Sequence, residues 1–287
     1  IARLVGSEMC IRDRNINCGG KLIDLTKPKI MGILNVTPDS FYDGGKFLNS
    51  DKYLMQVEKM LNEGATFIDI GGMTSKPGSK EIPVSEELSR VIKAVENVSN
   101  KFPKAIISVD TYRSEVAEES VNSGAQIIND ISGGSFDNKM FKTIAKLNVP
   151  YIIMHINERP ETMQQNPEYE DILFEIGYYF SKKVFKARAA GINDIIIDPG
   201  FGFGKELDDN YKILKNLNAL MVENIPMMIG VSRKSMIYKK LKITSEQSLN
   251  GTTCVNTVGL IQGVNILRVH DVKEAKQCID IVNSLNN

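Results

Sequence analysis

The sequence has no net charge and no long apolar run. Lys plus Arg and Asp plus Glu each number 35, so the formal charge of the 287 residues is zero. This balance gives no indication of a nucleic-acid or membrane partner, although a local basic pocket for a small anion would not show in it. No apolar run approaches the ~20 residues that span a bilayer, and the N-terminus lacks the apolar core of a secretory signal. We therefore expect a cytoplasmic protein with neither of these partners.

Cysteine and histidine are also scarce. The chain has no CxxC pair, and its four cysteines are scattered: Cys10, Cys18, Cys254 and Cys278. This pattern favours structural thiols in a reducing cytosol over disulfides or a zinc site. The two histidines, His155 and His270, have no carboxylate at metal-ligand spacing, which argues against a metal site built on them. A Ser-His-Asp hydrolase is disfavoured because the chain has no GxSxG elbow.

The first 14 residues differ from the rest of the chain. They begin with Ile rather than Met and show no clear periodicity. We interpret residues 1–14 as a non-native or disordered tail, and residues 15–287 as one catalytic domain.

From residue 30 onward, short β-rich runs alternate with amphipathic segments. Each run is nearly continuous in Ile, Val, Met and Leu, as expected for strands buried on both faces of a parallel sheet. The predicted strands span 30–36, 67–72, 105–111, 127–132, 151–156, 194–200, 226–232 and 266–271. Helices are predicted between them, for example over 50–64, closing at Gly64, and over 85–102, with Ser85 as the cap and an apolar stripe of Leu88, Val91, Ile92 and Val95.

Eight strands with intervening helices in about 250 residues are typical of a (β/α)8 TIM barrel. The alternative on pattern alone is a doubly wound open sheet. The opening CGGKLIDL predicts a short extra strand or hairpin at the bottom of the barrel. Two Gly/Pro-rich loops, 37–47 and 71–83, exceed a minimal βα connection, so we expect mobile lids over the site.

Polar residues follow or end nearly every predicted strand, and in a barrel these ends converge on one mouth. They are Asn35, Asp69, Asp110, Asn129, Asp130, His155, Asp198, Ser232, Arg268, His270 and Asp271. Each alone is commonly a cap or a buried hydrogen-bonding group, but their agreement over so many strands indicates a site.

The character of these residues indicates the ligand. Asp110, Asn129 and Asp198 offer acceptors and an amide, which suit a flat heterocycle with N–H donors. Cations and donors suit a phosphate or diphosphate: Lys234 with Arg233, then Arg268 and His270. The glycine-rich segment 198–205, DPGFGFGK, is either a tight turn that brings N–H groups near a ligand or a plain βα turn, and it is not a Walker loop.

At this point the motifs resemble those of a known family. ILNVTPDSFYDGG (33–45) and IDIGGMTSKPGS (68–79) resemble the first two signatures of dihydropteroate synthases. IISVDT, IINDISGG, MHI, DPGFGFGK, GVSRKS and RVHD resemble the later strand segments in order, so the resemblance covers residues 17–287.

The resemblance implies an enzyme of folate biosynthesis, a sulfonamide target, that joins a pterin diphosphate to 4-aminobenzoate with Mg²⁺. It implies that the pterin is held by Asp110, Asn129, Asp198 and Lys234, and the diphosphate by Asn35, Lys76, Arg268 and His270. Asn35 would also help to coordinate Mg²⁺, and the aminobenzoate pocket would be bordered by Phe41, Ser75, Pro77 and Ser235. We expect Asp110, Asp198, Lys234 and Arg268 to act in catalysis.

The second loop departs from the family pattern. Glu-Ser-Thr-Arg-Pro-Gly is usual there, and this chain has Met73-Thr74-Ser75-Lys76-Pro77-Gly78. Lys76 keeps the charge of the usual Arg but loses its planar fork, and the segment 156–160 also departs. We expect a working synthase with altered Michaelis constants and altered sulfonamide sensitivity.

Two other functions are compatible with parts of this pattern. A methyltransferase that binds methyltetrahydrofolate would share the Asp and Asn pterin contacts but needs no diphosphate cations. A non-catalytic pterin-binding barrel would be compatible with the changed loop. The family is typically dimeric, and the small, apolar segment 248–263 is either an interface helix of a homodimer or a helix packed on the barrel alone.

Overall fold

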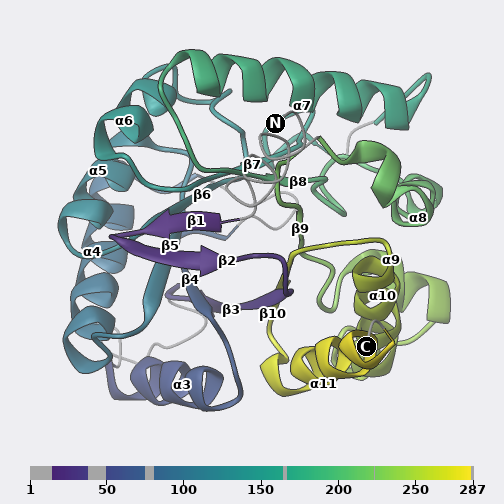
Figure 1. The fold of residues 1–287 in the computed structure, drawn as a ribbon, viewed down its shortest axis with the longest axis horizontal. Coiled ribbons are helices and arrows are strands. Elements are labelled where there is room, and N and C mark those ends of the chain that lie inside the picture. Colours follow the sequence, from purple (N-terminus) through teal and green to yellow (C-terminus); the bar gives the residue numbers. More distant parts are fainter. Residues whose placement is uncertain (1–14, 38–49, 75–80, 164–166, 223, 286–287) are drawn as a thin grey trace, which may run out of the picture.

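Eight parallel strands curl into a barrel with helices around it (Figure 1). The computed structural model describes residues 15–37, 50–74, 81–163, 167–222 and 224–285, so the tail 1–14 lies outside the described residues. Neighbouring strands in the sheet follow the order β8-β7-β6-β5-β4-β3-β10-β9. A parallel bridge between Ile197 and Met227 joins the two ends of this sheet. The predicted TIM barrel is therefore confirmed over the doubly wound alternative.

The strands lie where the apolar runs predict them. They are β3 (Lys29–Asn35), β4 (Phe67–Gly71), β5 (Ile106–Asp110), β6 (Ile127–Asp130), β7 (Tyr151–Met154), β8 (Ile195–Asp198), β9 (Met228–Ile229) and β10 (Ile266–Val269). The helices are α3 (Ser50–Asn62), α4 (Val84–Lys101), α5 (Ser114–Asn122), α6 (Met140–Leu147), α7 (Ile172–Ala189), α8 (Leu207–Lys215), α9 (Ser235–Leu241), α10 (Leu249–Ile261) and α11 (Val272–Ser284), with 3-10 turns η1 (Leu217–Leu220) and η2 (Glu246–Ser248).

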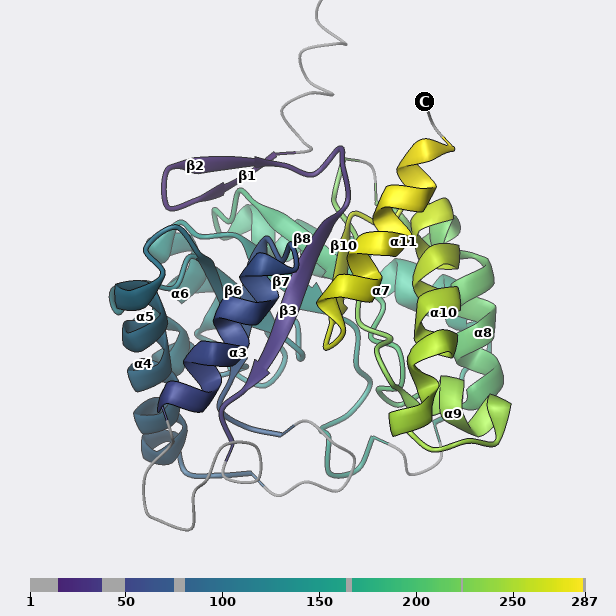
Figure 2. The same cartoon turned by 90° about the horizontal axis from the view of Figure 1, so that it is seen from below.

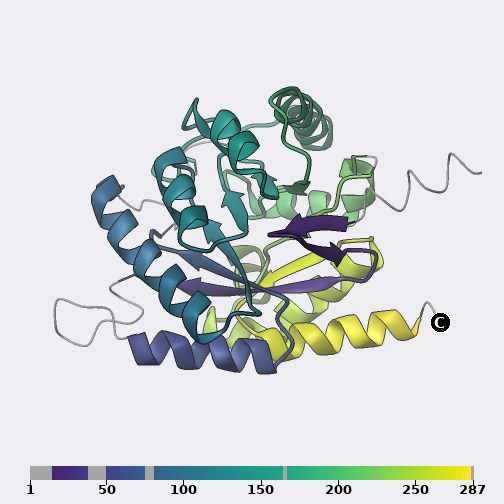
Figure 3. The same ribbon diagram turned by 60° about the vertical axis from the view of Figure 1, so that its left-hand side comes forward.

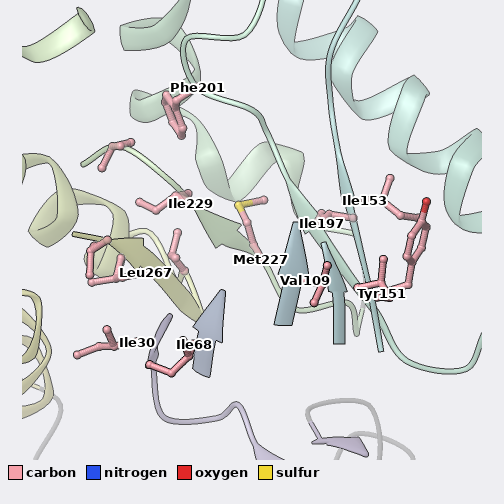
Figure 4. Close-up of a cluster of buried hydrophobic side chains, with 14 of the residues drawn as sticks. Ile30, Ile68, Val109, Tyr151, Ile153, Ile197, Phe201, Met227, Ile229 and Leu267 are labelled. Atoms are coloured by element: carbon pink, nitrogen blue, oxygen red, sulfur yellow. The ribbon is translucent and has the colours of Figure 1, made fainter. Parts of the chain in front are cut away.

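Alternate residues of each strand face opposite sides of the barrel wall, as strand geometry requires. One set packs against the surrounding helices and forms the main core, for example Ile68, Val109 and Ile197 (Figure 4). The other set faces the barrel axis. Every strand of the barrel contributes one residue to an inner apolar layer: Met31, Phe67, Ile106, Ile127, Ile152, Ile196, Met228 and Ile266.

A hairpin of β1 (Asn15–Cys18) and β2 (Lys21–Asp24) closes the bottom of the barrel, as predicted (Figure 2). Its apolar side chains Ile16, Cys18 and Ile23, with Leu25 just after it, belong to the same cluster as the inner apolar layer. Asp194, before β8, accepts a 3.0 Å hydrogen bond from the backbone N–H of Asn17 and anchors the hairpin. The barrel is thus sealed at the N-terminal ends of its strands, which leaves the C-terminal ends for a site.

Strand β3 lies against both α3 and α11, which follow one another along one side of the molecule (Figure 3). Gly32 permits this close approach, because a Cβ there would lie 2.6 Å from Met60 Sδ.

The capping prediction for α4 was wrong: the helix begins at Val84 with Pro83 at the N-cap position and no side-chain capping bond. Proline fits a helix start because it has no N–H to leave unsatisfied. None of the described helices is long and apolar enough to cross a bilayer.

The seal predicts a difference between two leucines of the hairpin region. Leu25 is fully buried and Leu22 is 71% exposed. We expect Leu25→Ala to lower the free energy of unfolding by about 2–5 kcal/mol, through lost burial and the cavity that remains. The matched control Leu22→Ala should change it by less than about 0.5 kcal/mol. Urea unfolding followed by circular dichroism measures both, and equal losses would contradict a sealing role.

Candidate active site

Two residues beyond the inner apolar layer, the side chains that face the axis become polar. On β4 the step runs from Phe67 to Asp69, on β6 from Ile127 to Asn129, and on β10 from Ile266 to Arg268. The same alternation brings in Ser108 on β5 and Asp198 on β8. The polar residues meet inside the barrel mouth because they share one face of their strands, not because they come last in them.

Asp69 is the centre of this layer. It is fully buried, and its Oδ2 accepts hydrogen bonds from Arg268 Nε at 2.7 Å and from Asn129 Nδ2 at 3.0 Å. Its Oδ1 is buried and has no hydrogen-bond partner in the described part of the chain. Because Asn129 turns its amide nitrogen toward Asp69, its amide oxygen remains for a donor on a ligand.

Arg268 joins Asp69 to a second carboxylate. Its Nη2 donates to Asp110 Oδ2 at 2.7 Å. Burial disfavours the charge of Arg268, but the carboxylates of Asp69 and Asp110 outweigh this effect and raise its pKa. Burial raises the pKa of Asp110 to about 7, against the attraction of Arg268. Within the described residues two of the five guanidinium N–H groups are used in these bonds, which leaves three for an anion.

Asp198 and Lys234 form the other side of the mouth. Burial raises the pKa of Asp198, and the charge of Lys234 opposes this rise. Burial also lowers the pKa of Lys234 to about 8. Lys234 donates to the carbonyl of Phe201 and lies 4.5 Å above the ring of Phe203. It is therefore a cation held by a carbonyl and an aromatic face, close to but not bonded to the carboxylate.

The turn that follows β8 resolves the two interpretations of DPGFGFGK. Gly200, Gly202 and Gly204 all have positive φ, at 68°, 80° and 59°. A Cβ on Gly200 would lie 2.1 Å from the carbonyl oxygen of His155, so only glycine fits. The N–H groups of Gly200 and Gly202 donate to Asp198 Oδ1 and Asn210 Oδ1, each at 2.7 Å. These two N–H groups are therefore bonded within the protein rather than offered to a ligand, as expected for a plain βα turn. The carbonyls of the same turn accept hydrogen bonds from Lys205 and Lys234.

The remaining predicted residues in the described part of the chain lie around this mouth. Asn35 is exposed at the end of β3, with its Oδ1 near Gly71. Ser235 begins α9 and borders a cavity of about 280 Å³ between α8 and α9. His270 follows β10, and its backbone N–H donates to Ser232 Oγ at 3.2 Å. His270 is exposed as a residue, but desolvation of its ring and the charge of Arg268 lower its pKa to about 4, so it is neutral at neutral pH.

Some polar residues that follow the strands do not belong to the mouth. Asp130 is one residue past Asn129 and faces outward, where its Oδ2 accepts a 2.6 Å bond from the hydroxyl of Tyr151. His155 is one residue past Met154; it is buried with its ring 4.8 Å from that of Tyr179.

Arg233 does not join Lys234 as an anion ligand. Its Nε and Nη2 bind both oxygens of Asp271, each at 2.9 Å. That bidentate pair holds the loop before α9 to the end of β10, so the structure directs Arg233 to Asp271 rather than to an anion beside Lys234.

Four predicted residues, Phe41, Ser75, Lys76 and Pro77, lie outside the described residues. Conversely, two buried residues received no specific contact from the sequence: Asp69, which was only one of the strand-end polar residues, and Lys205. The signal for Asp69 was its place two residues after Phe67 on the inner face. Lys205 is 4% exposed directly after the glycine turn, and a lysine that ends a glycine-rich segment was the available signal.

A metal could find only part of its coordination here. The described residues contain no group of three His, Cys, Asp or Glu side chains placed to hold an ion. The amide oxygen of Asn35 is a hard donor at an exposed strand end, which suits a single bond to Mg²⁺. Mg²⁺ commonly takes one or two protein ligands and completes its shell with water and substrate phosphates, so the donor set fits a cation that arrives with a diphosphate.

Comparison with known proteins gives a consistent result. The family model described as pterin binding enzyme matches residues 31–270. Dihydropteroate synthase of Escherichia coli K12 is 42% identical over 265 residues, covering 92% of this chain and 93% of that protein. A Yersinia pestis dihydropteroate synthase solved with a sulfonamide drug superposes with a TM-score of 0.89 at 40% identity, over 95% of this chain and 99% of that one. A Xanthomonas albilineans dihydropteroate synthase with 4-aminobenzoic acid gives 0.88 at 34% identity, over 95% and 98%.

The burial and the charges around Arg268 predict that Asp110 titrates at an unusually high pH for an aspartate. Asp110 should titrate near pH 7 in the ligand-free protein, since burial raises its pKa and the charge of Asp69 adds to the rise. In Asp69→Asn the pKa of Asp110 should fall, because a repelling carboxylate is gone and Arg268 is left to Asp110 alone. NMR of ¹³C-labelled aspartate carboxyls measures both values. The exposed control Asp280→Asn should leave the titration unchanged; an Asp110 that titrates near 4 in the wild type would contradict this account.

Proposed function

Since the chain belongs to the dihydropteroate synthase family of pterin-binding enzymes, we propose that it condenses 6-hydroxymethyl-7,8-dihydropterin diphosphate with 4-aminobenzoate. The products are 7,8-dihydropteroate and diphosphate, and the enzyme is a transferase that forms a C–N bond. The observation that carries this proposal is the inner polar layer: carboxylates and an amide for a heterocycle beside cations for a diphosphate, above a sealed apolar floor.

The pterin ring is proposed to bind Asp110, Asn129, Asp198 and Lys234. Asp198 is buried and its Oδ1 already accepts from Gly200, so Oδ2 remains for ring N–H donors. Asn129 offers its amide oxygen and one N–H after bonding to Asp69. A buried carboxylate is costly without donors, and this cost favours a ligand rich in N–H groups.

The diphosphate is proposed to bind Arg268, His270 and Asn35, with Lys76 as a further contact outside the described residues. Arg268 keeps three N–H groups after its two carboxylate bonds, enough to hold two phosphate oxygens. His270 is neutral at neutral pH, so it contributes a hydrogen bond rather than a charge. Mg²⁺, bound through Asn35 and the diphosphate, would supply neutralisation of the leaving-group charge.

In the reaction, the CH2–O bond of the pterin substrate breaks and its electron pair leaves with the diphosphate oxygen. The lone pair of the arylamine forms the new C–N bond, and the amine nitrogen then loses a proton. Arg268 is fixed before the ligand arrives and stabilises the charge that grows on the leaving oxygen without reorganising. Positive charge that develops on the methylene–pterin unit is stabilised by Asp110 and Asp198. No covalent enzyme intermediate is required.

Aminobenzoate is proposed to bind at the start of α9, beside Ser235. The other proposed contacts, Phe41, Ser75 and Pro77, lie outside the described residues, as do residues 38–47 and 75–80 of the two predicted lids. The relative from Xanthomonas albilineans was solved with 4-aminobenzoic acid, which supports a pocket for the same compound here. The sulfonamide complex of the Yersinia pestis relative supports sulfonamide binding to this chain.

A homodimer is proposed through α10 and α11, which pack against each other. One face of α10 is buried on the barrel, including Gly251 and Gly259, so the interpretation as a barrel-packed helix holds for that face. The opposite side exposes Ile261 at 64%, and α11 exposes Ile281 at 63%. Large apolar side chains exposed on two helices that pack together favour an interface.

A cytoplasmic location is also proposed. Within the described residues Cys18, Cys254 and Cys278 are free thiols, as a reducing compartment favours.

Residues 15–287 are proposed to form one catalytic domain. Neither the methyltransferase nor the non-catalytic barrel is favoured by a particular feature of the site.

The synthase activity predicts a defined assay result. Purified protein with Mg²⁺, the pterin diphosphate and labelled 4-aminobenzoate should form dihydropteroate. Lys234→Met should lower kcat/KM for the pterin substrate about tenfold to a hundredfold, through loss of a charged hydrogen-bond donor. The exposed control Lys273→Met should retain wild-type kinetics. Absence of product with the wild type, together with Mg²⁺-dependent pterin diphosphate binding by calorimetry, would identify a non-catalytic binder instead.

Because the second loop departs from the family pattern at Lys76, we expect that restoring the usual arginine lowers a substrate KM. Lys76→Arg restores the planar fork that the family usually has there and should lower the KM of an anionic substrate about threefold to tenfold. The same coupled assay measures it, with sulfonamide inhibition recorded in parallel. An unchanged KM for both substrates would show that the replacement is neutral.

If α10 and α11 form the dimer interface, a charge placed there should lower the mass of the protein in solution from dimer to monomer. Ile261→Lys places a charge in the proposed interface and should convert the wild-type dimer to a monomer in light scattering after size exclusion. Phe174→Lys on α7, another large apolar residue exposed at 71%, is the matched control and should stay dimeric. A monomeric wild type, or dissociation by the control alone, would rule out this interface.

A further inference from the structure

A second lysine lies behind the turn that follows β8. The side chain of Lys205 is buried, and its Nζ donates to three backbone carbonyls: Phe203 at 2.8 Å, Gly200 at 2.9 Å and His155 at 3.3 Å. The ammonium group has three N–H donors, so these acceptors use all of them. The turn is thus wrapped around a buried cation.

Among the described residues Lys205 forms no ion pair, and its Nζ has carbonyl acceptors only. A buried ammonium without a carboxylate is costly, and a methionine or leucine of similar volume would fill the same space without that cost. The three carbonyls explain why a donor is needed at this position. Two of them belong to the turn itself, and the third, of His155, belongs to the end of β7, so the lysine fastens the turn to the neighbouring strand.

The same turn holds two groups of the mouth. The N–H of Gly200 donates to Asp198 at 2.7 Å, and its carbonyl is one of those bound by Lys205. Lys234 donates to the carbonyl of Phe201 and lies over the ring of Phe203, whose carbonyl is also bound by Lys205. The lysine behind the turn therefore fixes the residues that orient the carboxylate and the cation in front of it.

We propose that Lys205 is a positioning residue for pterin diphosphate binding, acting through the 199–204 turn on Asp198 and Lys234. The proposal rests on the proposed function, because it concerns the affinity for that substrate. Lys205 is given no direct contact with the pterin diphosphate, because its three donors are occupied by backbone carbonyls.

The charge of Lys205 should make this positioning depend on pH. Burial and the nearby charge of Lys234 lower its pKa to about 7, while Asp198 and Asp209 oppose the shift. Burial and the charge of Lys205 keep His155 neutral by lowering its pKa. In the free protein Lys205 is therefore protonated below pH 7 and loses its charge and one donor above it. The turn is fastened best under slightly acidic conditions.

Three variants separate positioning from a general loss of structure. Lys205→Met keeps the volume and removes the donors, Lys205→Arg keeps a permanent charge, and Lys215→Met on α8 is an exposed control. We expect Lys205→Met to raise the KM for pterin diphosphate by about tenfold to a hundredfold through unsatisfied carbonyls, while the KM for 4-aminobenzoate changes less than twofold. Lys205→Arg should recover part of the loss, and Lys215→Met should match the wild type.

Binding of the pterin diphosphate by calorimetry at pH 6 and pH 8.5 gives a second readout. The wild type should bind at least tenfold more tightly than Lys205→Met at pH 6, and this advantage should shrink at pH 8.5. Titration of the ligand itself cancels in the ratio of the two proteins. An unchanged ratio across pH, or a Lys205→Met protein that loses only thermal stability and kcat, would overturn the proposal.

Hydrogen exchange of the turn tests the same idea without activity. The amides of Gly200 and Gly202 should exchange at least tenfold faster in Lys205→Met than in the wild type, with no change in α4 or α5. If the wild type makes no dihydropteroate, the proposed function fails while this exchange result still stands. Equal exchange in both proteins would overturn the positioning role whatever the activity.

Discussion

The site depends on one cation held between two carboxylates. Asp69 and Asp110 are brought close together inside the barrel, and without Arg268 their charges would repel each other in a poorly solvated space. Conversely, the largely buried guanidinium charge of Arg268 would be costly without a carboxylate partner. Such buried clusters contribute little net stability; their value lies in orientation that exists before a ligand binds. Because Asp69 also accepts from Asn129, a single carboxylate oxygen sets the direction of both the amide and the guanidinium.

The period of two along each strand places this cluster. An apolar layer that includes Phe67 and Ile127 fills the lower barrel, and a polar layer follows two residues later on the same face. The hairpin of β1 and β2 seals the other end of the barrel. Water therefore reaches the polar layer through the mouth, by the opening that a ligand also uses. The residues that face outward from the same strands pack beneath the helices, and this packing supports the wall on which the cluster is mounted.

Lys234 in the mouth and Lys205 behind the turn after β8 differ from Arg268 in their chemistry. Arg268 has a pKa raised by its two carboxylates, so its charge is permanent. Lys234 and Lys205 have carbonyl partners and burial lowers their pKa to about 8 and about 7. The region that receives an anionic diphosphate therefore combines one permanent positive charge with two lysines. A bound anion would favour the protonated form of these lysines. The glycines of the turn allow the carbonyls to reach both lysines.

The sequence by itself determined the barrel and most of its polar mouth. Continuous apolar strands are a local property of the chain, and the residues that end them, such as Asp110 and Asp198, follow directly. Which polar residues share the site was decided by tertiary structure. Asp130 and His155 faced outward because side chains alternate, and Arg233 was taken by Asp271. Asp69 meets Arg268 across 199 residues of sequence. No local pattern encodes such a contact, because it exists only when the sheet closes and brings its first and last strands together.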